Sequence, residues 1–345
     1  MPELSEQVLD QRQRPLGSLR LSVTDRCNFR CDYCMPEESY DWLPRKDLLD
    51  FEELRRVSYV FAELGVRQLR LTGGEPLLRR NLATLVRLLR DIPGIQDIAM
   101  TTNATLLANH AQSLRDAGLN RLTVSLDSLR RERFRKLTRR DDLAAVLEGL
   151  RVAKAVGFTR NKINTVLMRG INDDECFDLL DWAGEEDHEL RFIEYMDVGG
   201  ATGWHPERVL SRAQLLQRIS KHYGSCEPAE LGTAAPADRY RLPSGQIFGV
   251  ISSTTEPFCK QCHRSRVTVD GMWYLCLYAR QGFDLKRFLR GGASDREIKS
   301  FLRQVWGMRA DHGAEERLEL AERGRLADSS ELRKNPHLEM HKRGG

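Results

Sequence analysis

Three cysteine thiols lie within eight residues near the start of the chain, at Cys27, Cys31 and Cys34. Thiolates bind iron–sulfur clusters and zinc. A structural zinc site takes four ligands, but no fourth cysteine lies near this group, and the nearest histidine is His110. Three thiolates on a 4Fe–4S cluster leave one iron open to a substrate. The group favours such a cluster over two alternatives: a zinc site completed by a distant residue, and three cysteines on one helix face, which Pro36 disfavours.

A second group of three cysteines lies towards the other end of the chain, at Cys259, Cys262 and Cys276. His263 lies inside this group and could complete four ligands, so zinc remains an alternative there. Six of the eight cysteines fall into the two groups, which indicates metal chemistry in a reducing, cytoplasmic compartment. The remaining two, Cys176 and Cys226, are expected to be ordinary residues, and the sequence assigns them no role.

Two arginines follow the middle cysteine of the second group. Arg264 and Arg266 occupy alternate positions at the start of a predicted strand, 265–269, and therefore point to one face. Two guanidiniums side by side suit phosphate oxygens. Arginines on the surface of an exposed strand would show the same pattern, so both interpretations stay open.

The chain of 345 residues has the composition of a globular protein, with 41% hydrophobic residues and a formal net charge of +4. This mild charge does not indicate a general nucleic-acid surface, although a local anion site stays possible. No apolar run reaches the length of a membrane span, and the acidic N-terminus does not resemble a signal peptide. Residues 1–17 are polar and are expected to be loosely held.

Strands and helices are predicted to alternate from residue 18 to residue 196. Period-two and helical apolar patterns predict strands at 18–24, 66–72, 98–102, 121–126, 162–168 and 190–196, with helices at 51–64, 80–91, 105–117, 142–156 and 173–183. This order implies a parallel sheet, and six strands are too few for a complete eight-fold barrel. Residues 232–238 read as a linker, which predicts a partial barrel over 1–231 and a C-terminal domain over 232–345.

Several of these strands have one polar face. Leu69 and Leu71 alternate with polar residues, and the strands at 18–24, 121–126 and 162–168 show the same pattern. Strands of parallel sheets are usually apolar on both faces, so the polar face is predicted to line the lumen of a partial barrel. A sheet with one solvated face is the alternative. The predicted lumen would hold a polar, anionic ligand against Arg20, Arg70, Ser125 and Lys162.

The first cysteine group resembles that of the radical S-adenosylmethionine (SAM) enzymes. The likeness rests on its spacing, on Tyr33 before the third cysteine, and on the segment Gly73-Gly74-Glu75-Pro76 one helix further on. In that family the open iron binds the amino and carboxylate groups of SAM, and an electron from the cluster cleaves the sulfonium to give an adenosyl radical. The resemblance implies an α/β fold, an incomplete (βα)6 barrel followed by a C-terminal domain with a second cluster.

Nearly the whole chain resembles the GTP 3′,8-cyclases, the molybdenum cofactor biosynthesis protein A family. This likeness is carried by the two cysteine groups and by the segments 21–27, 191–199, 262–266 and Gly344-Gly345. It implies cyclisation of GTP to (8S)-3′,8-cyclo-7,8-dihydroguanosine 5′-triphosphate, the first step of molybdenum cofactor biosynthesis. The adenosyl radical would take hydrogen from C3′ of the ribose, and the carbon radical would attack C8 of guanine.

The resemblance also implies a role for individual residues. Two 4Fe–4S clusters would be held by Cys27, Cys31, Cys34 and by Cys259, Cys262, Cys276. SAM would be bound by Tyr33, Gly74, Ser125 and Met196. GTP would be bound by Arg20, Arg70, Thr101, Lys162, Arg264, Ser265 and Arg266. The residues implied in catalysis are Arg20, Arg264, Arg266, Gly344 and Gly345. The chain departs from the family pattern at Ala104, where glycine is common, and at Arg343, where isoleucine is common.

The implied partners are GTP, an electron-donating reductase and, by pathway, a downstream cyclic pyranopterin monophosphate synthase. Neither nucleic acid nor membrane is expected, and the oligomeric state, a homodimer included, stays open. A radical SAM enzyme with an auxiliary cluster acting on a peptide is the alternative enzyme. A module of two zinc knuckles is the alternative without catalysis. The long strand–helix array disfavours the module, and the Arg-x-Arg segment and terminal glycines disfavour the peptide enzyme.

Overall fold

The structure, a computed structural model, describes residues 7–230 and 236–344. Its strands are β1 (Ser18–Ser22), β2 (Gln68–Thr72), β3 (Asp97–Thr102), β4 (Arg121–Ser125), β5 (Lys162–Leu167), β6 (Glu189–Glu194), β7 (Glu227–Glu230), β8 (Asp238–Arg241), β9 (Ile247–Ile251), β10 (Arg264–Val267), β11 (Met272–Tyr274) and β12 (Phe283–Asp284).

The α-helices are α1 (Phe51–Ala62), α2 (Leu82–Arg90), α3 (Leu107–Asp116), α4 (Arg131–Thr138), α5 (Leu143–Ala155), α6 (Cys176–Glu185), α7 (Arg212–Tyr223), α8 (Lys286–Arg290), α9 (Asp295–Gly307), α10 (Gly313–Leu318), α11 (Ser329–Lys334) and α12 (Met340–Arg343). Short 3₁₀ helices are η1 (Arg45–Asp47), η2 (Pro76–Leu78), η3 (Asp173–Glu175), η4 (Pro206–Arg208), η5 (Cys259–Gln261) and η6 (Pro336–Leu338).

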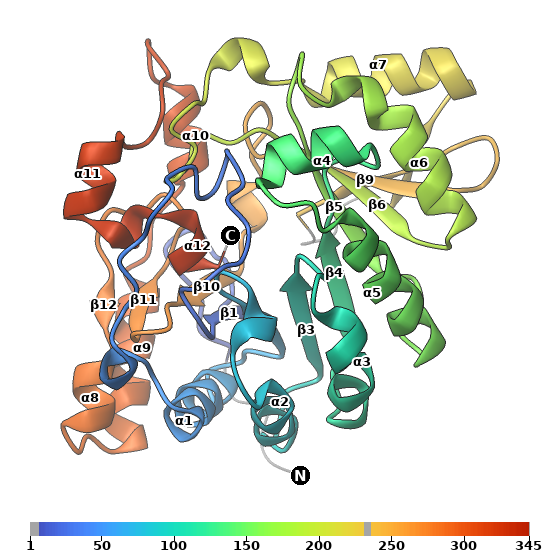
Figure 1. Cartoon of the computed structure of the whole chain (residues 1–345). Coiled ribbons are helices and arrows are strands. Elements are labelled where there is room, and N and C mark those ends of the chain that lie inside the picture. Colours follow the sequence, from blue (N-terminus) through green and yellow to red (C-terminus); the bar gives the residue numbers. More distant parts are fainter. Residues whose placement is uncertain (1–6, 231–235, 345) are drawn as a thin grey trace.

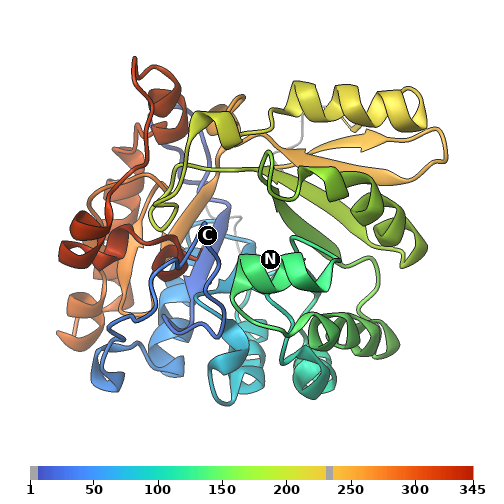
Figure 2. The same ribbon diagram turned by 45° about the horizontal axis from the view of Figure 1, so that its top comes forward.

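All the described strands join one sheet in the order β12-β11-β10-β1-β2-β3-β4-β5-β6-β9-β8-β7. The strands from β10 through β1–β6 to β9 are parallel, and the outer strands on both sides are antiparallel. The sheet curves with helices around its outside (Figures 1 and 2), and its edge strands β12 and β7 are not joined. The predicted incomplete (βα)6 barrel is therefore confirmed, and the C-terminal part of the chain adds a parallel strand on each side of it.

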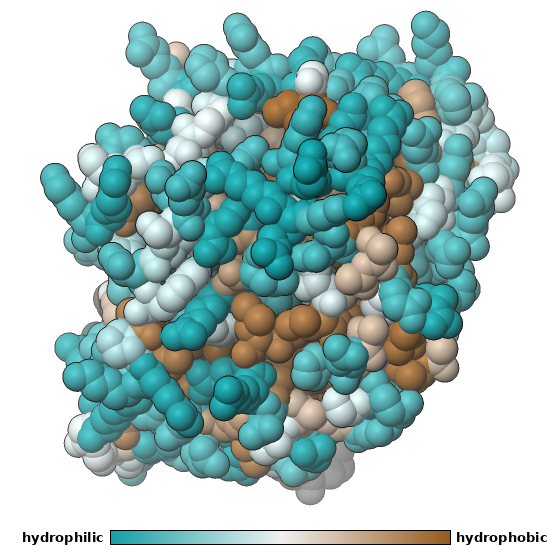
Figure 3. Space-filling view, viewed as in Figure 1, coloured by the Kyte–Doolittle hydropathy of each residue, from teal (hydrophilic) through white to brown (hydrophobic). Residues whose placement is uncertain are grey.

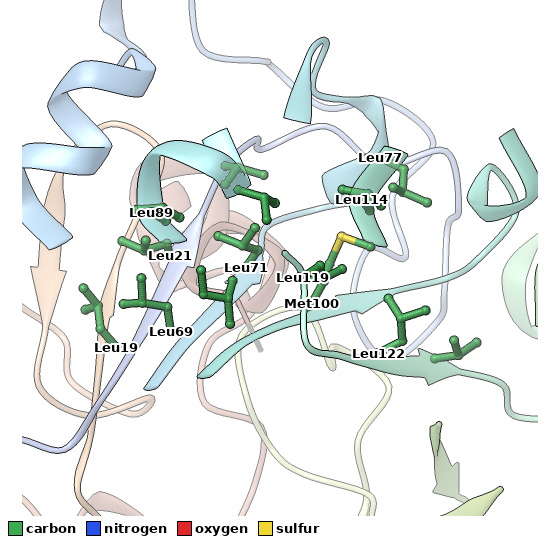
Figure 4. Packing of buried hydrophobic residues seen from close by; sticks show 14 of the residues in the cluster. Leu19, Leu21, Leu69, Leu71, Leu77, Leu89, Met100, Leu114, Leu119 and Leu122 are labelled. Carbon is green, nitrogen blue, oxygen red and sulfur yellow. The ribbon is translucent and has the colours of Figure 1, made fainter. Parts of the chain in front are cut away.

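The alternation predicted in the strands sets the inside and the outside of this barrel. Leu19 and Leu21 of β1 lie beside Leu69 and Leu71 of β2 and pack towards the helices (Figure 4). Successive side chains of a strand point to opposite faces, so the polar residues between these leucines face the lumen. The same residues thus build the core on one side of the sheet and a polar cavity wall on the other.

The helices of the barrel begin and end close to the predicted positions. α1 starts with a capping box in which Asp50 accepts from the Glu53 backbone and Glu53 accepts from the Asp50 backbone. The chain leaves this helix through Gly65, whose φ of +105° suits glycine. The charged helix α4 was not predicted, because only Phe134 and Leu137 carry its apolar face.

Two sequence predictions about connecting segments need correction. Residues 7–17 are not loosely held, because Val8 and Leu16 are buried and Leu16 N donates to Val8 O at 3.1 Å. The predicted linker at 232–238 ends inside β8, which begins at Asp238. The boundary between 231 and 232 lies outside the described residues, so the division into 1–231 and 232–345 stays a prediction.

The face of the molecule seen in Figure 3 is mainly hydrophilic, with apolar side chains gathered near its centre above α2. Within the described residues, no helix has both the length and the apolar character that a membrane crossing requires.

Candidate active site

The loop that carries Cys27, Cys31 and Cys34 follows β1 and is not helical. Its last turn is closed by a hydrogen bond from Cys34 N to Cys31 O at 2.9 Å. Arg30 stabilises the loop through two hydrogen bonds. Its Nη1 donates to the carbonyl of Cys27 at 2.9 Å, and its backbone N donates to Thr138 O at the end of α4. Three cysteines on a helix face are therefore excluded.

The three thiols of the first group are partly buried and lie near one another. Burial raises the pKa of Cys31 and Cys34, and the neighbouring thiols of the group raise it further. Among residues 7–230 and 236–344, no three His, Cys, Asp or Glu side chains converge as ligands of a single metal ion. In an iron–sulfur cluster each thiolate binds a different iron, so nearby thiols need not converge on one point. The chemistry of the donor set, three neighbouring thiols, fits an iron–sulfur cluster.

The two glycines after β2 bring that strand end against the backbone leading to the cysteine loop. Gly74 N donates to Thr24 O at 2.9 Å. A Cβ added at Gly73 would overlap Thr24 O, and one added at Gly74 would overlap Arg26 O. Only glycine permits this approach, which leaves the main chain of Gly74 beside the first cysteine group.

Glu75 fixes the ends of β2 and β3 relative to each other. Its buried carboxylate accepts from Thr102 Oγ1 at 2.7 Å, from Asn103 N at 2.7 Å and from Leu77 N at 3.0 Å. Burial raises the pKa of Glu75 to about 7 in spite of these hydrogen bonds. The next residue after Asn103 is Ala104, which adopts a φ of +62°, so the glycine common in the family would relieve strain there.

The four residues predicted to bind SAM lie along one edge of the sheet. Tyr33 Oη donates to Asp127 Oδ2 at 2.6 Å, and burial raises the pKa of Asp127 to about 6. Gly74 and Ser125 lie at the carboxyl ends of β2 and β4, and Met196 follows β6. The carboxyl ends of parallel strands are where α/β enzymes bind their ligands. The structure thus brings these positions together, and their contact with SAM stays a prediction.

Three arginines predicted to bind GTP occupy neighbouring strands at the same level. Arg20 of β1 is in register with Arg70 of β2 and with Arg266 of β10. Burial and, to a smaller extent, neighbouring guanidiniums lower the pKa of all three, to about 10 for Arg70 and Arg266. Cations held together in a poorly solvated lumen form a strong anion site.

The polar wall continues across β3, β4 and β5. Arg70 Nη1 donates to Thr123 Oγ1 at 3.0 Å and to Thr101 Oγ1 at 3.4 Å. Lys162 of β5 is in register with Thr123. Burial lowers the pKa of Lys162 to about 7, with further contributions from Arg191 and other cations. An anionic ligand in the lumen would favour the charged form of this lysine.

In the second cysteine group, Cys259 begins η5, Cys262 follows η5, and Cys276 lies two residues after β11. Burial raises the pKa of Cys259 and Cys276. Burial acts in the same sense on Cys262, but Arg264 and Arg309 outweigh it and lower the pKa of Cys262 to about 6. Arg264 Nη2 also donates to Cys262 Sγ at 3.7 Å. At Cys262 the surroundings thus favour a thiolate, the form that binds iron.

The residues between these cysteines separate into two faces. Arg266 is only 7% exposed, so the alternative of surface arginines on an exposed strand is wrong. Ser265 is buried in register with Leu19, on the face that packs towards the helices. The ring of His263 packs against Gly17, where an added Cβ would lie 3.2 Å from its Cδ2. This position gives no support to histidine as a fourth ligand of the group.

A buried charged network that the sequence did not single out supports the second cysteine group. Asp10 accepts from Arg14 Nε at 2.7 Å and from Arg309 Nη1 at 3.1 Å. The two guanidiniums also donate to the carbonyls of Cys259 and Cys262, each at 2.9 Å. The N-terminal segment thus positions the loop of a metal site 245 residues further along the chain. In the sequence, the only sign of this network is the Asp-x3-Arg spacing of Asp10 and Arg14. That spacing is also common among surface residues.

The described part of the C-terminal segment reaches the strands β1 and β10 of the barrel wall. Gly344 O accepts from Arg20 Nε at 2.7 Å and from Arg266 Nη1 at 2.8 Å. Lys342 O accepts from Ser22 Oγ at 2.8 Å. The predicted catalytic residue Gly345 lies outside the described residues.

Comparison with known proteins defines the class of this fold and site. Residues 21–183 match the radical SAM superfamily, and residues 188–314 match Molybdenum Cofactor Synthesis C. Among solved structures, Streptococcus suis SuiB bound to S-adenosylmethionine superposes with a TM-score of 0.57 at 15% identity, covering 90% of this chain and 72% of SuiB. This likeness concerns the fold. The chain is a radical SAM protein.

Full-length relatives define the family. The chain is 48% identical to GTP 3′,8-cyclase 1 of Mycobacterium tuberculosis (strain CDC 1551 / Oshkosh), over 100% of this chain and 97% of the relative. It is 44% identical to the GTP 3′,8-cyclase of Staphylococcus haemolyticus, over 91% and 94%. The chain therefore belongs to the GTP 3′,8-cyclase family. This confirms the predicted family, and with it an enzyme that uses SAM and iron–sulfur clusters.

Proposed function

We propose that this protein cyclises GTP to (8S)-3′,8-cyclo-7,8-dihydroguanosine 5′-triphosphate, the first step of molybdenum cofactor biosynthesis. The observation that carries the proposal is the set of neighbouring cations on the lumen wall, of which Arg266 is buried and the others are partly buried. Arg20, Arg70 and Arg266 adjoin one another there, and Lys162 extends the set. A bound triphosphate would offset the electrostatic repulsion among these neighbouring cations.

The residues of the chain divide between two cofactor sites and a substrate site. Cys27, Cys31 and Cys34 would hold the first 4Fe–4S cluster, and Cys259, Cys262 and Cys276 the second. When bound, the clusters and SAM supply the one-electron chemistry of the reaction. Gly74 offers main-chain groups to SAM where no side chain obstructs, and the hydroxyl contact with Asp127 orients the ring of Tyr33. Ser125 and Met196 complete the proposed SAM contacts.

The chain's task at the substrate is positioning. Arg20, Arg264 and Arg266 would bind the triphosphate, together with Arg70 of β2, Thr101 of β3 and Lys162 of β5. Ser265 would contribute through its backbone. Fixing GTP in the lumen holds the ribose in one orientation and excludes water from the reacting carbon. The proposed catalytic role of Gly344 and Gly345 is to close the lumen over the bound substrate.

The tail and the substrate would share two arginines. Arg20 and Arg266 already donate to Gly344 O. A guanidinium has five N–H donors in one plane, so each arginine can bind the tail carbonyl and a phosphate oxygen together. The shared donors would therefore couple the seating of the tail to the presence of GTP.

The test is an anaerobic assay of the reconstituted protein with GTP, SAM and a chemical reductant. The expected products are 5′-deoxyadenosine and the cyclised nucleotide in comparable amounts, with about eight irons per chain. Failure to consume GTP, together with SAM cleavage driven by a peptide, would overturn the proposal in favour of the alternative enzyme. A reductase as electron donor, a cyclic pyranopterin monophosphate synthase as consumer of the product, and a homodimer are proposed partners that separate binding experiments would test.

A further inference from the structure

Arg343, the residue immediately before the terminal glycines, is buried and makes several contacts. Arg343 is 1% exposed, although it is a charged residue two positions from the end of the chain. Isoleucine is common at this position in the resembling family, and neither the sequence pattern nor the comparisons give Arg343 a role. Burying a guanidinium is costly unless it is well hydrogen-bonded, so its contacts need a physical account.

The guanidinium of Arg343 connects the tail to the second cysteine group. Its Nη1 donates to the carbonyl of Leu277, next to Cys276, at 2.6 Å, and its Nε donates to the carbonyl of His337. Its Cζ lies 4.1 Å from the ring centroid of Tyr274, the last residue of β11. A planar guanidinium can donate to two carbonyls and stack on a ring at once, which isoleucine cannot do.

The partner carbonyl of His337 is itself held in place. The His337 ring is hydrogen-bonded through Nε2 to Asp270 Oδ2 at 2.7 Å, and Asp270 lies in the turn between β10 and β11. Burial raises the pKa of Asp270, but its contacts with His337 outweigh this and lower it. The C-terminal segment therefore contacts the β10–β11 hairpin twice, through Arg343 on Tyr274 and through His337 on Asp270. The same hairpin carries Arg266.

The terminal glycines alone would hold their position poorly. Glycine has a high conformational entropy in the free chain and no side chain to pack. The carbonyl of Gly344 binds Arg20 and Arg266 only when the preceding backbone is fixed within reach. Arg343 stands directly beside it, and its contacts reach the same hairpin.

We propose that Arg343 is a positioning residue that anchors the C-terminal segment 335–344 to the β10–β11 hairpin and its cysteine loop, and so holds Gly344 against Arg20 and Arg266. The use of this anchor in turnover rests on the proposed function, whereas the anchor itself does not. In this chain an arginine fork replaces apolar packing as the means of seating the tail.

The test is hydrogen–deuterium exchange of the cluster-loaded protein without GTP, compared between wild type, Arg343→Met, Arg343→Lys and the control Arg333→Ala. Arg333 is exposed on α11 and donates to a carbonyl of its own helix. Arg343→Met keeps the length of the side chain but removes both donors. Loss of charge-assisted hydrogen bonds should speed exchange at residues 340–344 by about tenfold or more. Arg333→Ala should leave it unchanged.

Exchange of these amides within about twofold of wild type in Arg343→Met, with β3 still protected, would overturn the anchor. If Arg343→Met loses protection throughout the core, Arg343→Lys decides by the same criterion, because its single nitrogen cannot serve both carbonyls. A second readout is the ratio of 5′-deoxyadenosine to cyclised nucleotide, which should rise in Arg343→Met. A loosened tail with an unchanged ratio keeps the anchor and counts against a part for the tail in the proposed function.

Discussion

Replacing Gly344 by alanine tests directly whether the tail occupies the lumen during turnover. Gly344 has a φ of +65°, and a Cβ added there would overlap Thr72 Oγ1 and lie 3.1 Å from Ser22 Oγ. The left-handed conformation alone costs an alanine about 1–2 kcal/mol. Because Thr72 and Ser22 belong to β2 and β1, the backbone of Gly344 must move away from the strands to relieve the overlap.

Moving Gly344 would break its hydrogen bonds to Arg20 and Arg266. Hydrogen bonds to charged groups are worth about 1.5–3 kcal/mol each. Losing even one of them, together with the backbone strain, lowers the equilibrium constant for seating of the tail by roughly a hundredfold or more. If the seated tail is the active form, Gly344→Ala should lose cyclisation by up to this factor while the protein keeps its clusters.

The assay measures the anaerobic rate of cyclised nucleotide at saturating GTP and SAM, with 5′-deoxyadenosine counted separately. Gly170→Ala is the matched control, because Gly170 has a φ of +73° and nothing within 4 Å of an added Cβ. It carries the conformational cost without the overlap. The double variant Thr72→Ala/Gly344→Ala removes the overlap and should recover part of the lost rate. Equal rates for Gly344→Ala and Gly170→Ala would refute the reasoning.

Three further predictions concern the cysteine groups and the lumen cations. Cys31→Ser should abolish SAM cleavage, whereas Cys262→Ser should still bind SAM but lose GTP turnover; normal cyclisation by Cys262→Ser would contradict the assignment of the second group. Arg20→Ala should weaken GTP binding by about ten- to a hundredfold and barely change SAM affinity, as calorimetry of each ligand can measure; equal loss of both would indicate misfolding instead. The pKa of Lys162 is about 7 rather than 10.5, so its charge is lost as the pH rises through 7. GTP affinity should therefore fall by up to about tenfold per pH unit above that value. The fall should be absent in Lys162→Met, and equal slopes for both proteins would rule out this lysine as its source.

The sequence alone determined the local features of the barrel. Alternation around Leu69 and Leu71 predicted both the strand and its polar face, because a strand displays its side chains with a period of two. The start of α1 has an equally local cause, because Asp50 and Glu53 form its capping box. The spacing of Cys27, Cys31 and Cys34 predicted a cluster loop, since ligands this close in the chain need no distant partner.

Only the tertiary structure decided which distant segments share the site. The sequence predicted a strand after Cys262, and the family resemblance implied that Arg20 and Arg266 share a ligand, but no residue pattern indicated that β10 pairs with β1. Asp10 and Arg14 look like surface residues until burial beside the second cysteine group gives them partners. Arg20 meets Gly344 across 324 positions. Periodicity predicts which face of a strand a side chain occupies. The pairing of strands and the burial of charges depend instead on contacts between remote parts of the chain, and these contacts produce no periodic pattern in the sequence.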